Sequence, residues 1–294
     1  MKSLIVLISN PTAKKASERK VALASYYLQS KGFEVEVFFT DKKGDAEKLA
    51  RKAARKSPHL IIAGGGDGTI NEVINGIAGT QTPMAVMPLG TTNVLAKELG
   101  IPENIKKAME AAVRGNPRVV SLGKITLANP SSPVTRYFCL MAGVGFDGKA
   151  VRGINETFKK ISGKGAYIYS GMKTLSGFNP ELLAFTVDGK QYYGYSAIIG
   201  NASRYGGNFR ATPDARIEDP YLYACLFKGK KRLDTLRYIL GIIKGSHLNF
   251  RDVEYLRAKH IKIEGEAHVQ IDGDYIGMTP AEISAVPDSL RLVY

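Results

Sequence analysis

Apolar runs and helical patterns alternate along the first third of the chain. Runs typical of buried strands cover residues 3–9, 33–40, 59–64 and 84–90. Helical patterns cover residues 17–31, 44–56, 69–77 and 94–99. In the third helical pattern, which begins around Thr69, Ile70, Val73, Ile74 and Ile77 fall on one face. This alternation predicts βαβ units and a mainly parallel sheet, which binds ligands beyond the carboxyl ends of its strands.

From about residue 118 the pattern changes to β-branched and aromatic runs. Asp188-Gly189 and Asp272-Gly273 are typical hairpin turns, and helical stretches occur near residues 148–176 and 233–244. We therefore expect an antiparallel sandwich or barrel. The predicted domains are residues 1–122, an α/β domain, and residues 123–294, a β-rich domain. The last strand, SLRLVY, belongs either to the second domain or to the first.

The length of 294 residues is typical of about two domains. The sequence has 41 Lys and Arg against 27 Asp and Glu, a formal net charge of +14. This excess favours nucleotides, nucleic acid or acidic lipid surfaces as partners, or serves solubility alone. We do not expect nucleic-acid binding, because no RRM, KH or helix-turn-helix signature occurs.

Two observations bear on the compartment. Cys139 and Cys225 lie in apolar stretches without metal or disulfide spacing, which indicates buried free thiols. The segment SLIVLISNP fits a first strand better than a signal peptide, and no run of about 18 apolar residues occurs. We expect a soluble, cytoplasmic protein.

The strand that ends in Gly64-Gly65-Gly66 leads into a helix, an arrangement suited to phosphate. Glycines let backbone N–H groups approach a ligand, and the N-terminus of the helix favours anions. Thr69 and Glu72 also match a capping box, so a structural role is the alternative for them.

Asp67 follows these glycines, where a carboxylate would repel phosphates unless a cation or a proton intervenes. It is a candidate to hold Mg²⁺ or to accept a hydroxyl proton during phosphoryl transfer. The alternative is an ordinary turn aspartate. There is no Walker A motif, and the G-x-G-x-x-G at Gly143, Gly145 and Gly148 lacks the context of a dinucleotide site.

The combination GGGDGTINEVINGI and PLGTTNVLAKELGIP resembles the diacylglycerol kinase and sphingosine kinase superfamily, most of all its soluble bacterial members. The resemblance covers nearly the whole chain. It implies an α/β nucleotide domain followed by a β-sandwich lipid domain, with the active site between them. It also implies an enzyme that uses ATP and Mg²⁺ to phosphorylate the hydroxyl of diacylglycerol or a related lipid.

The same resemblance implies a nucleotide site. Asn10 lies in an Asn-Pro turn after the first strand, and Thr40 precedes Gly-Asp-Ala. Such hydroxyls and amides can contact phosphate or ribose, although each alone is more typical of a turn or cap. The residues implied are Asn10, Thr40, Gly65, Gly66, Asp67, Gly68, Thr69, Asn71, Glu72, Gly90 and Thr91.

The stretch TPDARIEDPYLY resembles the loop of this family that binds a structural Mg²⁺. The implied ligands are the Asp219 side chain and the carbonyls of Arg216 and Tyr221, which suit a hard cation. Pro220 stands where the family usually has Gly. Asp147, in GVGFDGKAV, is either hydrogen-bonded towards this metal network or a turn aspartate.

In QIDGDYIG, Asp274 occupies the position of the family glutamate that is proposed as general base, one methylene shorter. The alternative is a polar hairpin residue. Val94 replaces an aspartate that many bacterial diacylglycerol kinases have, which favours sphingosine-kinase-like members and leaves the lipid open.

Residues 227–245 and 158–178 combine cationic with apolar side chains. Either segment could rest on a membrane surface with anionic phospholipid, where a lipid substrate would be found, or could complete the core. The sequence is compatible with an oligomer.

Two other functions remain as alternatives. An NAD kinase also uses a Gly-Gly-Asp-Gly turn, but the later glycine-rich stretch of that family is absent here. The substitutions at Asp274 and Pro220 would also suit a catalytically weak nucleotide- or lipid-binding protein.

Overall fold

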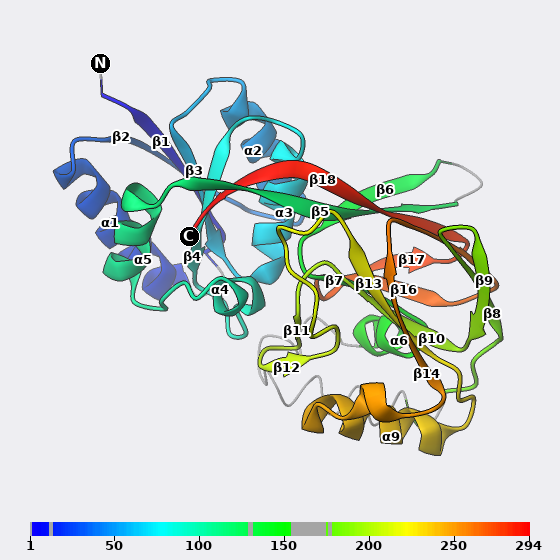
Figure 1. Ribbon diagram of the computed structural model, residues 1–294. Helices are drawn as coiled ribbons and strands as arrows, with labels where there is room; N and C mark the ends of the chain where they lie inside the picture. Colours follow the sequence, from blue (N-terminus) through cyan, green and yellow to red (C-terminus); the bar gives the residue numbers. More distant parts are fainter. Residues whose placement is uncertain (1, 12–13, 129–131, 154–174, 176–177) are drawn as a thin grey trace. The chain divides into compact units, whose positions relative to one another are not determined.

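The computed structural model describes residues 2–11, 14–128, 132–153, 175 and 178–294 (Figure 1). The chain forms two compact units. Unit 1 comprises Met1–Ser121 with Asp288–Tyr294, and unit 2 comprises Leu122–Pro287. Two long strands, β5 (Pro117–Leu127) and β18 (Ala281–Val293), each contain residues of both units. Among the described residues, no helix is both long and apolar enough to span a membrane.

Unit 1 is built on a parallel sheet, as the alternating pattern predicted. Its strand order is β2 (Glu34–Phe39), β1 (Leu4–Ser9), β3 (Leu60–Gly65), β4 (Pro83–Pro88) and the last part of β18, and every neighbouring pair is parallel. The helices are α1 (Lys14–Ser30), α2 (Asp45–Ala54), α3 (Asp67–Ile77), α4 (Val94–Glu98) and α5 (Ile105–Arg114). Helix α1 packs against α5, and α2 packs against α3.

Two features of unit 1 differ from the expectation. Helix α3 begins at Asp67 rather than around Thr69, because the extended Gly66 is its N-cap and no side chain caps it. Helix α5 was not expected, although its signals are present in the sequence. Its buried face carries Ala108 and Met109, and the Asn104 side chain accepts a hydrogen bond of 3.1 Å from Lys107 N, which caps the helix.

Unit 2 contains two groups of antiparallel strands. One is the six-stranded sheet β14 (Val253–Ala258), β13 (Leu222–Phe227), β10 (Ser196–Gly200), β7 (Met141–Val144), β16 (His268–Ile271) and β17 (Asp274–Met278). The other contains β18, β15 (His260–Glu264), β8 (Leu183–Val187) and β9 (Lys190–Gly194), with β5 paired to β6 (Val134–Phe138). A short ribbon pairs β11 (Arg204–Tyr205) with β12 (Phe209–Arg210).

Side chains from both groups of strands form one core, so the predicted sandwich is confirmed. Phe138, Phe185 and Leu226 are among its members. The predicted hairpins are also present, with positive φ at both turn residues in each: 45° and 84° at Asp188-Gly189, and 47° and 86° at Asp272-Gly273. Cys139 and Cys225 are buried free thiols, and burial raises the pKa of Cys225 to about 12.

Three helical segments complete the description of unit 2. These are α6 (Phe146–Arg152), α9 (Arg232–Lys244) and a 3-10 turn (His247–Asn249). Helix α9 matches the second expected helical stretch. Most of the first stretch, near residues 148–176, lies outside the described residues beyond α6.

Gly76→Ala tests the packing of α3 on α2. In an open helix this change would stabilise by about 1 kcal/mol. Here the added Cβ would lie 2.5 Å from Glu47 O and 2.8 Å from Ala50 Cβ, so we expect the opposite sign. The expected loss in the free energy of unfolding is about 1–3 kcal/mol, measured by urea unfolding followed by circular dichroism.

Gly79→Ala is the matched control, because its φ is 77° and nothing lies near the added Cβ. Only backbone strain of about 1 kcal/mol is expected there. A Gly76→Ala protein as stable as the wild type would contradict the packing described.

Candidate functional site

The loops that follow the first four parallel strands of unit 1 meet at one edge of its sheet. Asn10 follows β1, and its N–H donates to Gly64 O at 3.0 Å. Thr40 follows β2, and its N–H donates to Ser9 O at 3.0 Å. Because these strands are parallel neighbours, the structure brings these two residues beside the glycine turn that follows β3.

The turns that follow β3 and β4 touch through their glycines. A Cβ on Gly90 would lie 2.6 Å from Gly66 Cα, so the two backbones can approach only because Gly90 has no side chain. Gly65 is equally constrained, since a Cβ there would lie 2.6 Å from Thr69 Cβ. The result is a surface of backbone groups at the start of α3.

Asp67 is the first residue of α3 and connects the two turns. Its Oδ1 accepts a hydrogen bond of 3.3 Å from Leu95 N, near the start of α4. Burial raises the pKa of this carboxyl above its usual value, although the N–H groups of Val94 and Leu95 oppose the shift. A partly desolvated carboxylate at the end of a phosphate-type turn is a suitable cation ligand.

Glu72 has a structural partner that the sequence did not indicate. Its carboxylate accepts hydrogen bonds from Gly44 N at 2.8 Å and Ala46 N at 3.1 Å, at the start of α2. It does not reach back to its own helix, so the capping box with Thr69 is wrong. Glu72 instead satisfies unpaired donors of α2 and holds the loop that follows Thr40.

The other residues of the predicted nucleotide set have simpler surroundings. Gly68 and Thr69 lie in the first turn of α3, and Thr91 is exposed in the turn before α4. Asn71 is buried, and its Oδ1 accepts a hydrogen bond of 3.0 Å from Asn75 Nδ2. Their contacts with a nucleotide stay predictions.

Asp147 is fully buried in unit 2, in the first turn of α6. Its Oδ1 accepts a hydrogen bond of 2.6 Å from Tyr205 Oη, and its Oδ2 accepts one from Gln270 Nε2. Burial raises the pKa of Asp147, and these two hydrogen bonds oppose the shift. Gly143 leaves the room for this carboxylate, since a Cβ there would lie 1.8 Å from Oδ2.

The same network reaches the hairpin that carries Asp274, the half-buried first residue of β17. Gln270 Oε1 accepts a hydrogen bond of 2.8 Å from Gly273 N, the residue before Asp274. On the other side of the turn, the Asp272 carboxylate accepts from three consecutive backbone N–H groups, of residues 139–141, at 2.8–3.0 Å. Sequence reasoning missed Gln270 entirely and treated Asp272 only as a turn residue.

The predicted metal loop also belongs to unit 2. Asp219 N donates to Arg216 O at 3.0 Å, which closes a tight turn, and the ring of Tyr221 lies under the guanidinium of Arg257 at 4.4 Å. No cluster of three or more His, Cys, Asp or Glu side chains suited to a metal occurs among the described residues. One half-buried carboxylate beside backbone carbonyls is nevertheless a donor set that fits Mg²⁺.

The two buried aspartates should respond oppositely to replacement by asparagine. A raised pKa means that the folded state holds the Asp67 proton more tightly than the unfolded state, so its contribution to stability is lost as pH rises through the folded pKa. Asparagine carries no charge and can still accept from Leu95 N. We therefore expect Asp67→Asn to raise Tm at pH 7 without nucleotide, with a smaller gain at pH 4.

Asp147→Asn is the comparison. An asparagine has one acceptor oxygen for the two donors from Tyr205 and Gln270, and its amide would face a third donor. We expect a loss of about 1–3 kcal/mol at pH 7. Differential scanning fluorimetry at both pH values measures the two effects, and a stabilised Asp147→Asn protein would contradict the described network.

Comparison with known proteins identifies the family. The model of the diacylglycerol kinase catalytic domain matches residues 4–125, and that of the YegS C-terminal NAD kinase beta sandwich-like domain matches residues 141–294. The diacylglycerol kinase of Bacillus subtilis (strain 168) is 30% identical over 94% of this chain and 91% of its own length. That of Staphylococcus aureus (strain JH9) is 31% identical over 94% of this chain and 87% of its own length.

Solved structures agree with these matches. The crystal structure of a candidate diacylglycerol kinase from Bacillus anthracis superposes with a TM-score of 0.78 and 25% identity, covering 99% of this chain and 97% of that one. The yeast NADH kinase shares the fold with a TM-score of 0.55 and 13% identity, covering 100% of this chain and 84% of that one. On the strength of its two domain matches and its full-length relatives, the chain belongs to the diacylglycerol kinase family, a family of kinases.

Proposed function

We propose that the chain is a lipid kinase that uses ATP and Mg²⁺ to phosphorylate the hydroxyl of diacylglycerol or a related lipid. The observation that carries this proposal is the edge of the unit 1 sheet. There the loops of neighbouring parallel strands bring together Asn10, Thr40 and the touching glycines Gly66 and Gly90.

In this proposal the triphosphate of ATP binds the backbone N–H groups of the glycine turn and the N-terminus of α3. Asp67 holds Mg²⁺, directly or through water, because its partly buried carboxylate needs a cation beside the phosphates. When bound, Mg²⁺ neutralises part of the phosphate charge. Glu72 supports the site indirectly, by holding the start of α2 and the loop that contains Thr40.

Asp274 is proposed as the general base. The lipid hydroxyl oxygen forms a bond to the γ-phosphorus, the bond from that phosphorus to the bridging oxygen breaks, and ADP leaves. The hydroxyl proton passes to the Asp274 carboxylate. The bonds that Asp272 and Gln270 make around the turn support this role, since a base needs a fixed position.

A second Mg²⁺ is proposed in the loop of unit 2. The Asp219 carboxylate and the carbonyls of Arg216 and Tyr221 would hold it. Its contribution would be structural, because a hard cation can fix a turn that has few other interactions between side chains.

Two other functions stay as alternatives. The fold of yeast NADH kinase and the name of the matching sandwich model suit a kinase with a dinucleotide acceptor. Full-length relatives named diacylglycerol kinase favour the lipid. A nucleotide- or lipid-binding protein without turnover is the other alternative.

The proposal is tested by incubating the protein with radiolabelled ATP, Mg²⁺ and detergent-dispersed diacylglycerol, with NAD as a parallel acceptor. We expect label in phosphatidic acid and none in NADP. Asp67→Asn and Asp274→Asn should each lower kcat by about 100-fold or more, because one removes a cation ligand and the other removes the base. Asp274→Glu should keep most activity, since it restores the acid that the family has.

Glu103→Gln is the control, because it removes an exposed carboxylate of unit 1 outside the site. Label in NADP alone would replace the lipid with a dinucleotide as acceptor. ATP binding by calorimetry without label in any lipid extract would favour the binding protein. If Asp67→Asn lowers kcat less than about tenfold, Asp67 is only a turn residue.

A further inference from the structure

Helix α9 exposes a stripe of large apolar side chains. Leu233, Leu236, Leu240 and Ile243 are 76%, 39%, 46% and 50% exposed. Their spacing of three, four and three residues places them on one face of the helix. Contiguous exposed apolar surface on a folded protein commonly marks an interaction site.

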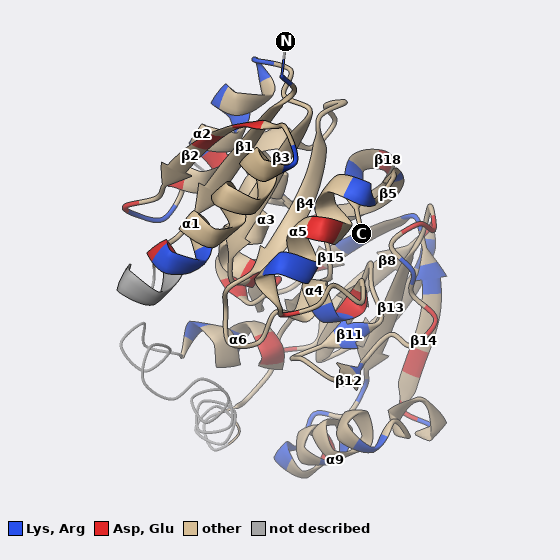
Figure 2. Cartoon of the chain, turned by 90° about the vertical axis from the view of Figure 1, so that its left-hand side faces the viewer, with Lys and Arg blue, Asp and Glu red and all other residues tan. Residues whose placement is uncertain are grey.

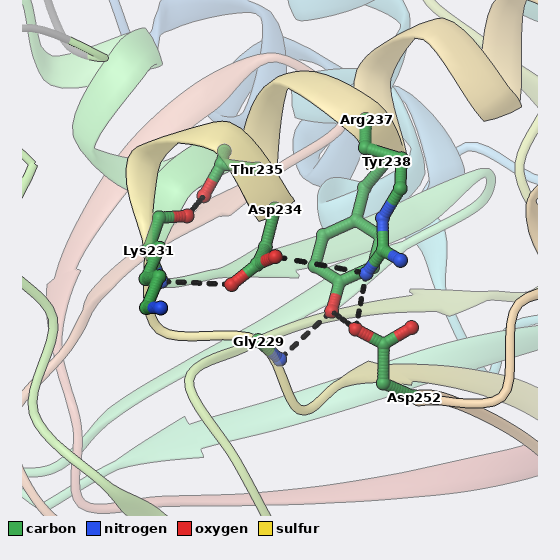
Figure 3. Close-up of polar contacts among 7 residues, drawn as sticks. All are labelled: Gly229, Lys231, Asp234, Thr235, Arg237, Tyr238 and Asp252. Carbon is green, nitrogen blue, oxygen red and sulfur yellow. Dashed lines mark hydrogen bonds and ion pairs between the residues drawn. The ribbon is translucent and has the colours of Figure 1, made fainter.

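The opposite face attaches α9 to unit 2, so the fold does not need the stripe. Tyr238 Oη accepts a hydrogen bond of 2.8 Å from Gly229 N and donates one to Asp252, as Figure 3 shows. Arg237 pairs with the same carboxylate. Gly241 lets Phe250 approach closely, since a Cβ there would lie 2.6 Å from the ring. Thr235 and Ile242 are also buried on this face.

The acidic groups around α9 are already engaged. Burial disfavours the charge on Asp252, but hydrogen bonds from Tyr238 and Arg237 outweigh it and keep the pKa of Asp252 below its usual value. Asp234 accepts a hydrogen bond of 3.0 Å from Lys231 N and lies 3.8 Å from Arg237. The network therefore leaves little uncompensated negative charge beside the stripe.

Cations border the stripe on both sides. Residues 228–244 contain six Lys and Arg against a single acid, and Figure 2 marks the cationic positions in blue. At about 100° per residue, exposed Arg232 lies at one border of the stripe and exposed Lys244 at the other. Neither has an ion-pair partner among the described residues.

We propose that α9 lies in the surface of an anionic lipid bilayer, with its four apolar side chains among the acyl chains and Arg232 and Lys244 at the headgroups. An apolar stripe bordered by cations is the pattern of an interfacial helix. A second copy of this chain is the poorer partner, because a symmetric contact through this face would bring like charges together. The proposal deepens the proposed function, on which it rests for the reason that the lipid substrate lies in the same bilayer.

Sedimentation with sucrose-loaded vesicles tests the surface on the full chain. Vesicles of phosphatidylcholine mixed with phosphatidylglycerol should bind the wild type, and pure phosphatidylcholine should bind it far less. The double variant Leu233→Ser/Leu240→Ser should lose about tenfold or more of its partition coefficient. Arg232→Gln/Lys244→Gln should weaken binding to the anionic vesicles alone.

Leu182→Ser is the matched control, because Leu182 is an apolar side chain outside α9 that is 54% exposed. Its vesicle binding should equal that of the wild type. Unchanged binding of the α9 double variant would overturn the proposal. So would a dimer, seen by light scattering, that the double variant loses while neither protein binds vesicles.

A kinase assay separates this proposal from the proposed function. With soluble short-chain diacylglycerol the α9 double variant should match the wild type, whereas with diacylglycerol in anionic vesicles it should be slower. Vesicle binding itself needs neither ATP nor turnover. Wild-type protein that phosphorylates no lipid but binds anionic vesicles through α9 would contradict the proposed function and support this surface.

Discussion

The contact between Gly66 and Gly90 is the constraint on which the nucleotide edge of unit 1 depends. Two turns from neighbouring parallel strands can touch only where side chains are absent. Their closeness brings the start of α4 to the start of α3, so that Leu95 N reaches Asp67. The desolvation of Asp67, and therefore its suitability for a cation, follows from a steric condition at two glycines.

The fold was largely predictable because its signals are local. Apolar periodicity identified the four strands of the parallel sheet that lie in the first third of the chain, and Asp-Gly pairs identified two hairpins. The pattern failed where a signal was weak or indirect. The buried face of α5 includes alanines, which contribute little hydrophobic contrast, and α3 begins two residues early because a glycine in an extended conformation serves as its cap.

The site was predictable only in part, because the partners of its side chains are distant in sequence. The glycine turn and Asp67 form a compact motif, and a motif can be read directly. Glu72 bonds to the start of α2, 28 residues away, and Gln270 bonds to Asp147, 123 residues away. Such pairings arise from the tertiary fold, so residue type and spacing assigned Glu72 to its own helix and passed over Gln270.

Strand β18 has a consequence for the order in which the chain can fold during synthesis. Its last residues pair with β4 in the parallel sheet of unit 1, although they follow all of unit 2 in the sequence. A nascent chain can form the first four strands of that sheet early, but β4 keeps an open edge until residues 291–293 have left the ribosome. Unit 1 therefore acquires its fifth strand only after the residues of unit 2 have been made, and the first part of the chain to be made is completed last.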